Sequence, residues 1–284
     1  MTSDDTLCYL NGEYQPLGAA RIPVLDRGFI FGDGIYEVVP AYRKKPFRLE
    51  QHLNRLQRSL AEARIDNPYS RGQWRAIVDR LIQSAPAEDL IVYMQVTRGV
   101  AKRDFAFPAN TTPTVFAMVS PLNRPSAAQR EKGLRAISVP DLRWLRCDIK
   151  SVSLLGPVLA RQQAAERGLD EVVQHRDGRL TEGSASNVWV VKAGRVLGPP
   201  RDHLILEGIR YEFIHELCER ASIPFEVRII SMNEVRGADE LMLSAATREV
   251  LPIVELDGHP IGDGRPGAVY QQLRRGYDAA IAAL

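Results

Sequence analysis

Lys150 and Glu182 are the residues of this sequence whose side chains and surroundings point most directly to chemistry. Lys150 lies in the run of residues 143–151, and Glu182 lies in the polar run 181–187. A lysine amine can form a Schiff base with an aldehyde, and a carboxylate can keep a pyridine nitrogen protonated so that the ring accepts electrons. Most lysines are solvated surface charges and most Thr-Glu-Gly runs are turns, so neither residue identifies a site alone. Together they match the two requirements of pyridoxal 5′-phosphate chemistry.

Three segments could bind an anion such as a phosphate group. His52 and Arg55 are three residues apart in a predicted helix, and arginine presents a planar fork of donors. Gly208 stands at the start of another predicted helix, where backbone N–H groups and the helix dipole favour negative charge. The small-residue run 244–247 follows a predicted strand and could also present backbone amides. The first two segments have alternative interpretations, namely a solvated helix face and a loop that enters a helix.

Motifs for metals and nucleotides do not appear in usable form. The run 215–219 begins like the zinc-protease helix motif but has Glu219 where the second histidine must stand. The five histidines otherwise lie too far apart to suggest a site, so no metal is predicted. Gly32-Asp33-Gly34 and Gly262-Asp263-Gly264 match neither the P-loop nor the dinucleotide fingerprint, and both are predicted to be turns.

Composition indicates a globular protein with ordinary partners. The chain has 284 residues, of which 45% are hydrophobic and 25% charged, enough for one large domain or two smaller ones. A net charge of +2 gives no electrostatic reason to expect nucleic acid or an anionic membrane as a partner. Three cysteines without a Cys-x-x-Cys spacing predict reduced thiols and a cytoplasmic location. The polar start and the lack of about 18 consecutive apolar residues argue against a signal peptide or a membrane span.

The first third of the chain reads as mixed strand and helix. Asn11-Gly12 between short apolar stretches predicts a β-hairpin. Leucines at helical spacing predict a helix over residues 48–64, and Ser70 opens a second one. Strands are expected at 91–96 and 114–119 because β-branched and aromatic residues gather there.

A change of composition divides the chain. Proline and polar residues at 120–126 predict a linker, which gives a small N-terminal domain over 1–120, a linker over 121–126 and a larger domain over 127–284. In the larger domain we expect strands at 171–173, 187–191 and 240–243, a helix from Gly208 and a closing helix over 266–283.

The motifs occur in an order that resembles one family. Residues 32–37, 50–56, 147–151, 181–187 and 205–209 follow the order of fold-type IV pyridoxal-phosphate enzymes. The sequence is most similar to the D-amino acid transaminases, from about residue 7 to the C-terminus. The resemblance implies a two-domain α/β (α+β) fold, with a small N-terminal α/β domain and a larger, β-barrel-like C-terminal domain with flanking helices. It also implies a homodimer in which each active site is completed by the neighbouring subunit.

The resemblance assigns roles to individual residues. Lys150 matches the Schiff-base lysine that also moves the substrate proton, Glu182 the partner of the pyridine nitrogen, and Tyr36 an active-site tyrosine. Leu206 matches the apolar residue beneath the cofactor ring. The cofactor phosphate and its surroundings are expected to involve Arg55, Ser184, Ser186, Gly208, Ile209, Arg210, Ala246 and Thr247.

The sequence departs from the family at the substrate and phosphate positions. Tyr93 and Arg103 match two groups that trap the substrate carboxylate, but Phe105 stands where the family has histidine, and a phenyl ring cannot donate a hydrogen bond. Arg210 and Ala246 stand where the family often has a hydroxyl, and Arg210 or Thr247 is expected to supply the missing contacts.

The activity implied by the resemblance is ping-pong transamination. Lys150 would hold pyridoxal phosphate as a Schiff base, with D-alanine- or D-glutamate-type donors and 2-oxo acids such as 2-oxoglutarate or pyruvate as acceptors. Because Phe105 suits an apolar substituent, an (R)-selective amine transaminase or mixed specificity is the first alternative. Branched-chain L-amino acid transamination, the aminodeoxychorismate lyase reaction and a non-catalytic cofactor-binding role are the others.

Overall fold

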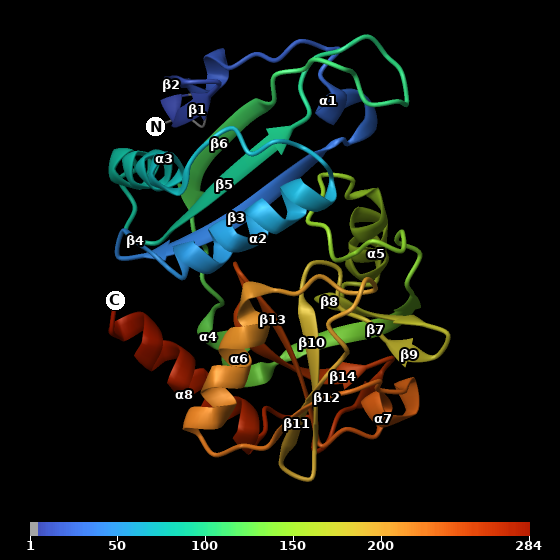
Figure 1. Cartoon of the computed structure of the whole chain (residues 1–284). Coiled ribbons are helices and arrows are strands. Elements are labelled where there is room, and N and C mark those ends of the chain that lie inside the picture. Colours follow the sequence, from blue (N-terminus) through green and yellow to red (C-terminus); the bar gives the residue numbers. More distant parts are fainter. Residues whose placement is uncertain (1–4) are drawn as a thin grey trace. The chain divides into compact units, whose positions relative to one another are not determined.

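A computed structural model of the chain describes residues 5–284, which form two compact units (Figure 1). Unit 1 holds the chain up to Asn123, the segment Ile149–Leu154 and the last residue, whereas unit 2 holds Arg124–Asp148 and Leu155–Ala283. The change of unit after Asn123 falls inside the segment 121–126, where we expected a linker. The segment around Lys150 differs from expectation, because it belongs to unit 1 and not to the C-terminal part 127–284. Residues 1–4 of the expected N-terminal domain lie outside the described residues.

Unit 1 is built on an antiparallel sheet with the strand order β2-β1-β6-β5-β3-β4 within residues 5–284. Its strands are β1 (Leu7–Leu10), β2 (Glu13–Pro16), β3 (Gly34–Tyr42), β4 (Lys45–Pro46), β5 (Leu90–Thr97) and β6 (Thr114–Pro121). Its helices are α1 (Arg27–Phe31), α2 (Leu49–Glu62) and α3 (Arg71–Ser84), with a 3-10 turn η2 (Leu17–Ala19).

Local sequence signals account for this unit. Asn11 and Gly12 form the turn between β1 and β2, both with the positive φ that such a turn requires (48° and 103°), so the hairpin prediction is confirmed. Ser70 caps α3 through a capping box with Gln73. The apolar stripe of α2 packs with α3 and the sheet in one core, and Figure 1 shows α2 running along β3. The predicted helices and strands of this unit are therefore confirmed.

Unit 2 contains a larger mixed sheet with the order β12-β11-β10-β13-β14-β7-β8-β9 among the described residues, and β15 pairs with β14. Its strands are β7 (Leu134–Pro140), β8 (Glu171–Arg176), β9 (Arg179–Leu180), β10 (Asn187–Lys192), β11 (Arg195–Gly198), β12 (Phe225–Val227), β13 (Glu240–Ala245), β14 (Glu249–Leu256) and β15 (His259–Pro260). Its helices are α4 (Ala127–Lys132), α5 (Leu155–Glu166), α6 (Ile209–Arg220), α7 (Met232–Arg236) and α8 (Ala268–Ala282).

Strand register in unit 2 decides which loops meet. β10 is antiparallel to β13, with Asn187 opposite Ser244. The residues just before β10 and those just after β13 therefore leave the sheet at the same end. α6 and α8 pack together through Phe213 and Tyr277, whose ring centroids are 5.0 Å apart. The strands and helices expected in this part of the chain are found.

Two further expectations concern the whole chain. Cys8, Cys147 and Cys218 are buried free thiols. Within residues 5–284 no helix is long and apolar enough to cross a membrane.

Candidate active site

Lys150 is fixed by its backbone to strand β3 of unit 1. The carbonyl of Lys150 accepts a hydrogen bond from the N–H of Tyr36 at 3.0 Å, and Ser151 forms a bridge with Ile35. On the other side, the N–H of Lys150 donates to Oγ of Ser59 in α2 at 3.3 Å. The segment therefore behaves as a short extra strand, which explains why Lys150 belongs to this unit.

The side chain of Lys150 lies against two stacked tyrosines. Its Nζ is 4.1 Å from the centroid of the Tyr36 ring, and the rings of Tyr36 and Tyr93 stack with centroids 5.7 Å apart. Burial, and to a lesser degree Tyr36, raises the pKa of Tyr93 to about 12. Tyr93 is therefore protonated at neutral pH, and its hydroxyl donates a hydrogen bond to Oε1 of Gln95 at 2.7 Å. The structure thus brings together three of the predicted residues.

Arg55 belongs to a buried charged cluster in the same unit. Its Nε and Nη2 bind the two carboxylate oxygens of Glu37 at 2.7 and 2.9 Å, and Nδ1 of His52 lies 2.8 Å from Glu37 Oε2. Burial alone would raise the pKa of Glu37, but Arg55 and His52 outweigh it and hold that pKa well below its usual range. Arg55 is therefore held by an ionised carboxylate.

Our sequence analysis assigned no role to Glu37. The signal was present, because Ile35, Glu37 and Val39 share one face of β3 by strand alternation, and Ile35 and Val39 are core residues. A carboxylate on such a buried face requires a cationic partner. The helix that carries His52 and Arg55 is the neighbour that supplies it.

Glu182 is held from three sides in unit 2. Arg143 donates to its Oε1, while the N–H of Leu206 and Nδ2 of Asn187 lie 2.9 and 3.5 Å from its Oε2. Arg143 is itself oriented by two contacts with Asp141, at 2.7 and 2.9 Å. Leu206 was expected beneath the cofactor ring, and its backbone additionally positions this carboxylate.

The charge of Glu182 calls for a cationic partner. Burial raises the pKa of Glu182 above its usual value, and Arg143 and the N–H of Leu206 only partly offset this effect. A further positive group beside the carboxylate would favour its ionised form. A protonated ring nitrogen is such a group, so Glu182 fits the role expected for it.

Three loops of unit 2 converge at one end of the large sheet. Residues 184–186 precede β10 and residues 246–248 follow β13, and the strand register places both at this end. The start of α6 joins them, because Nδ2 of Asn187 donates to the carbonyl of Leu206 at 2.9 Å. A Cβ atom at Gly208 would lie 2.2 Å from Oδ1 of Asn187, so a larger residue there would force the Asn187 side chain or the start of α6 to shift. All three loops were predicted from the sequence as candidate site segments, but their convergence was not.

A buried carboxylate, Glu171, links two of these loops. Oγ of Ser184 donates to it at 2.5 Å and Oγ of Ser186 at 3.3 Å, while Arg248 donates from the turn after β13 at 2.7 Å. The predicted hydroxyls are thus anchored by a residue that sequence analysis missed. Like Glu37, Glu171 is an acidic residue in an otherwise buried strand segment.

Arg210 and the turn after β13 are also in contact. Its Nη2 lies 3.4 Å from the carbonyl oxygen of Ala246, and its Nε donates to the hydroxyl of Tyr277 at 2.7 Å. Thr247 is the middle residue of the turn and is partly exposed. Two segments with predicted phosphate residues therefore adjoin each other. One is the start of α6, with Gly208, Ile209 and Arg210, and the other is the turn after β13, with Ala246 and Thr247.

Arg103 and Phe105 form a second group of contacts in unit 1. The Arg103 guanidinium carbon lies 5.4 and 5.6 Å from the ring centroids of Phe31 and Phe105, and Phe105 is 79% exposed. Asp104 stands between Arg103 and Phe105 in sequence, and its carbonyl accepts a hydrogen bond from Nη1 of Arg27 at 2.6 Å. The apolar ring at position 105 is thus an outward-facing feature of this loop.

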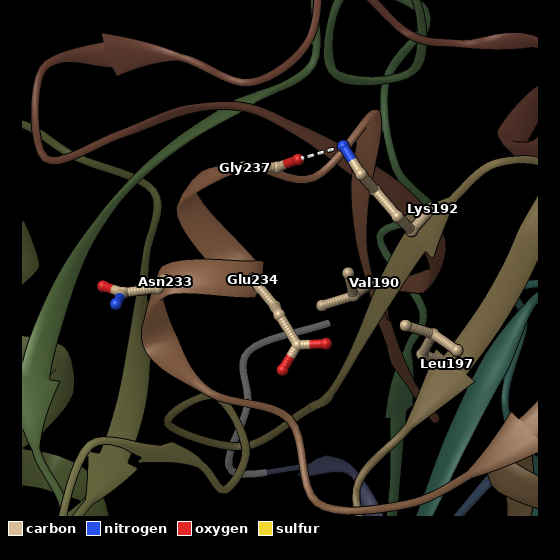
Figure 2. Close-up of a pocket in the computed structure, with 6 residues that line it drawn as sticks. All are labelled: Val190, Lys192, Leu197, Asn233, Glu234 and Gly237. Atoms are coloured by element: carbon tan, nitrogen blue, oxygen red, sulfur yellow. Dashed lines mark hydrogen bonds between the residues drawn. The ribbon is translucent and has the colours of Figure 1, made fainter.

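A separate hollow in unit 2 is lined by residues of β10, β11 and α7 (Figure 2). Its two charged side chains are engaged in local structure, since Nζ of Lys192 binds the Gly237 carbonyl and Asp239, and Glu234 takes part in the capping box of α7 and binds Arg228. The hollow therefore offers no group prepared for chemistry. Residues 5–284 also contain no group of three His, Cys, Asp or Glu side chains placed to share a metal ion.

Comparison with known proteins identifies the family. The family model for amino-transferase class IV matches residues 34–256, a range that includes both Lys150 and Glu182. The chain is a class IV aminotransferase. It is accordingly a pyridoxal-phosphate-dependent enzyme, and the expected class of enzyme is confirmed.

Curated relatives agree with this assignment. The chain is 38% identical to a D-alanine aminotransferase of Staphylococcus aureus over 274 residues, 96% of this chain and 97% of the relative. A D-alanine aminotransferase of Bacillus licheniformis is 36% identical, with 95% of each chain covered.

Solved structures extend the comparison to the fold. A branched-chain aminotransferase from Thermoproteus uzoniensis, solved with norvaline, has a TM-score of 0.88 at 24% identity, covering 98% of this chain and 95% of its own. A fold IV-transaminase from Curtobacterium pusillum has a TM-score of 0.82 at 26% identity, covering 96% and 93%. The expected fold-type IV class is confirmed.

Proposed function

We propose that this aminotransferase transfers the amino group of D-amino acids, of the D-alanine and D-glutamate type, to 2-oxo acids such as 2-oxoglutarate or pyruvate. Support for the donor comes from the D-alanine aminotransferases, which are up to 38% identical over nearly the whole chain. The two half-reactions would alternate at one site, with Lys150 as the Schiff-base residue.

The observation that carries the proposal is the environment of Glu182. When bound, pyridoxal phosphate supplies an aldehyde that reacts with amines and a protonated ring that accepts electrons from the substrate α-carbon. A buried carboxylate oriented by Arg143 and Leu206 is suited to keep a ring nitrogen protonated. We assign this role to Glu182.

The converging loops of unit 2 are suited to hold a phosphate group. The start of α6 offers backbone N–H groups at Ile209 and Arg210 and the positive end of the helix dipole. The 246–248 turn and the hydroxyls of Ser184 and Ser186 adjoin it. We also assign Arg55 to phosphate binding, because its guanidinium presents a planar fork of donors suited to a phosphate group.

Lys150 is suited to carry a proton because its backbone is fixed beside β3 while its amine lies against the Tyr36 ring. Its backbone is held on both sides, by Tyr36 and Ser59, so the amine is presented from a fixed point. We propose that this amine would hold the cofactor and, once the substrate amine has replaced it, would take up and return the proton of the substrate α-carbon, with Tyr36 beside it. Tyr93 and Arg103 would bind the substrate carboxylate.

Phe105 supports one alternative. A phenyl ring packed against Phe31, where its family has a histidine donor, favours an apolar substituent over a carboxylate. An (R)-selective amine transaminase activity, alone or beside the D-amino acid activity, is therefore the second candidate.

We further propose that the enzyme is a homodimer with shared active sites. Seven exposed apolar side chains in the described part of unit 1 lie on two segments, which are linked by a bridge between Asp26 and Val100. This apolar surface consists of Ile22, Val24, Leu25, Phe29, Val100, Phe105 and Phe107. Apolar patches of this kind mark protein interfaces, and a second copy of this chain is the partner that we propose for this one.

A half-reaction experiment tests the function directly. Purified protein loaded with pyridoxal phosphate is mixed with D-alanine, L-leucine or an (R)-arylalkylamine, without an acceptor. Absorbance then follows conversion to pyridoxamine phosphate, and the 2-oxo acid is assayed. Conversion by D-alanine with release of pyruvate is the expected result.

Other outcomes reassign the protein. Conversion only by the arylalkylamine would establish the second candidate, and conversion only by L-leucine would indicate a branched-chain donor. If none of them reacts, release of pyruvate from aminodeoxychorismate would test the lyase reaction. A cofactor adduct that no amine donor alters would indicate a binding protein.

A further inference from the structure

Arg210 lies where two of the proposed phosphate-binding segments meet. It is the second residue of α6 and only 2% exposed, one of the largest buried side chains of the described chain. One of its nitrogens donates to the hydroxyl of Tyr277 in α8 and another reaches the Ala246 carbonyl. A single side chain therefore joins the start of α6, the turn after β13 and helix α8.

We infer that Arg210 is a positioning residue for the cofactor phosphate. Arg210 holds the first turn of α6 against the Ala246 carbonyl. It thereby keeps a constant distance between the backbone N–H groups of α6 and those of the turn after β13. This inference rests on the proposed function and adds to it a determinant of phosphate binding particular to this chain. From the sequence we expected Arg210 or Thr247 to supply a direct contact with the phosphate, and the bonds of Arg210 to Tyr277 and Ala246 support an indirect role for Arg210.

Guanidinium is well matched to this task. Its donors point in fixed directions, so two acceptors on different elements can be engaged at once, which the single ammonium of lysine does less well. The hydroxyl of Tyr277 sets the direction of the fork. The buried positive charge also favours a dianion bound at the backbone amides nearby.

The turn after β13, which Arg210 contacts, is also held by ion pairs that do not involve Arg210. Arg248 is tied to Glu171, and Glu249 adopts a left-handed φ of 56° that a residue with a side chain rarely accepts. The buried carboxylate of Glu249 holds this conformation through ion pairs with Arg124, Arg130 and Arg274. The Ala246 carbonyl is thus a fixed point, and Arg210 connects α6 to it.

The test compares two ligands that differ only in the phosphate. Dissociation constants of the cofactor-free full-length enzyme are measured for pyridoxal phosphate and for pyridoxal. The constant for pyridoxal divided by the constant for pyridoxal phosphate gives the contribution of the phosphate. Arg210→Met should reduce this ratio by about 10- to 100-fold and leave the constant for pyridoxal unchanged. Arg210→Lys should recover only part of the loss.

Tyr277→Phe provides a second test that keeps the arginine. Removing the hydroxyl should lower the ratio by about threefold to tenfold, and the double variant with Arg210→Met should be no worse than Arg210→Met alone. Tyr270→Phe is the matched control, because Tyr270 is another buried tyrosine two turns earlier on α8 and does not bind Arg210. Its ratio should equal that of the wild type.

The outcomes separate this inference from the proposed function. If the wild type does not prefer pyridoxal phosphate over pyridoxal, the phosphate site itself is wrong. If the wild type shows the preference and Arg210→Met retains it within twofold, the role of Arg210 is wrong. Full recovery by Arg210→Lys, or a Tyr277→Phe variant with the wild-type ratio, would also overturn the positioning role in favour of a direct charge effect.

Discussion

At the residue scale, neighbours give two buried glutamates opposite properties. Glu37 lies between Arg55 and His52, which hold its pKa well below the usual range against the effect of burial. Glu182 has Arg143 beside it, yet burial prevails and raises its pKa. The first carboxylate is satisfied within the protein, whereas the second gains from an added cation. This contrast agrees with the assignment of the ring nitrogen to Glu182, which the order of the sequence motifs had suggested.

The low pKa of Glu37 predicts acid sensitivity. A carboxyl group whose pKa is lowered by folding contributes stability above its unfolded pKa, and this contribution is lost as the pH falls toward the folded value. The unfolded value is about 4.3, so wild-type free energy of unfolding should fall steadily below about pH 5. In Glu37→Gln this part of the acid dependence should be missing, with stability at neutral pH lower by about 3 kcal/mol because the ion pair between Glu37 and the buried Arg55 is broken.

Urea unfolding at a series of pH values measures both effects. Glu50→Gln is the control, because Glu50 lies on the same helix as Arg55 but its ion pairs with Arg71 and Arg75 are half exposed. That change should cost less than about 1 kcal/mol and leave the acid slope intact. Equal slopes in the wild type and Glu37→Gln would contradict the prediction.

Lys150→Ala tests the proposed nucleophile. The variant should lose the adduct that borohydride reduction otherwise fixes between protein and pyridoxal phosphate, because no amine remains at this position beside β3. Mass spectrometry of the reduced protein provides the readout. An adduct at the wild-type level would assign the Schiff base to another lysine.

At the element scale, the candidate phosphate site is made of loop starts and helix starts. The pairing of β10 with β13 brings residues 184–186 and 246–248 to one end of the sheet, and Asn187 ties the segment before α6 to them. Each loop was recognisable from its small and polar residues. Their convergence depends on strand order, because β10 and β13 are neighbours although about 50 residues separate them in sequence.

Gly208→Ala tests this convergence. The added Cβ would meet Oδ1 of Asn187 at 2.2 Å, so Asn187 or the start of α6 must shift. We expect a loss of about 1–3 kcal/mol in pyridoxal phosphate affinity, measured by equilibrium titration of the cofactor-free protein. Gly72→Ala in α3 is the control, since its Cβ would meet open space, and it should leave affinity unchanged. Unaltered affinity in Gly208→Ala would separate this helix start from the cofactor.

At the scale of the whole molecule, surface composition bears on assembly. The apolar surface of unit 1 defined above includes Phe29 and Phe105, which are 70% and 79% exposed. Large exposed aromatic side chains on adjoining segments are typical of surfaces that become buried on association. A cytoplasmic location stays a prediction from the sequence.

Phe29→Glu should weaken the proposed dimer, because a charge at an apolar interface must be desolvated without a partner. Sedimentation at a series of protein concentrations should show a shift of the monomer–dimer equilibrium of at least about tenfold. Ile229→Glu, at an exposed apolar residue of unit 2, is the control and should sediment like the wild type. A Phe29→Glu protein that remains fully dimeric would move the interface elsewhere.

The sequence by itself determined the elements and the chemistry. Leucine spacing in α2, the capping serine of α3 and the Asn-Gly turn act within a few residues, so local patterns were enough to predict them. The types of Lys150 and Glu182, with the order of motifs around them, were enough to predict a pyridoxal-phosphate enzyme, and membership of class IV bears this out.

The tertiary structure decided the partners. Glu37 and Glu171 acquire roles only because strand pairing and helix packing bring arginines to them across long sequence separations, 77 residues in the case of Arg248 and Glu171. The attachment of Lys150 to β3, and so to unit 1, likewise depends on backbone hydrogen bonds that no local pattern encodes. Arg210 shows the same limit, since its type suggested an anion contact, whereas its contacts with Tyr277 and Ala246 depend on how the helices and the turn pack. A buried charge is matched by whichever group the fold places nearest, and that placement is a property of the folded chain.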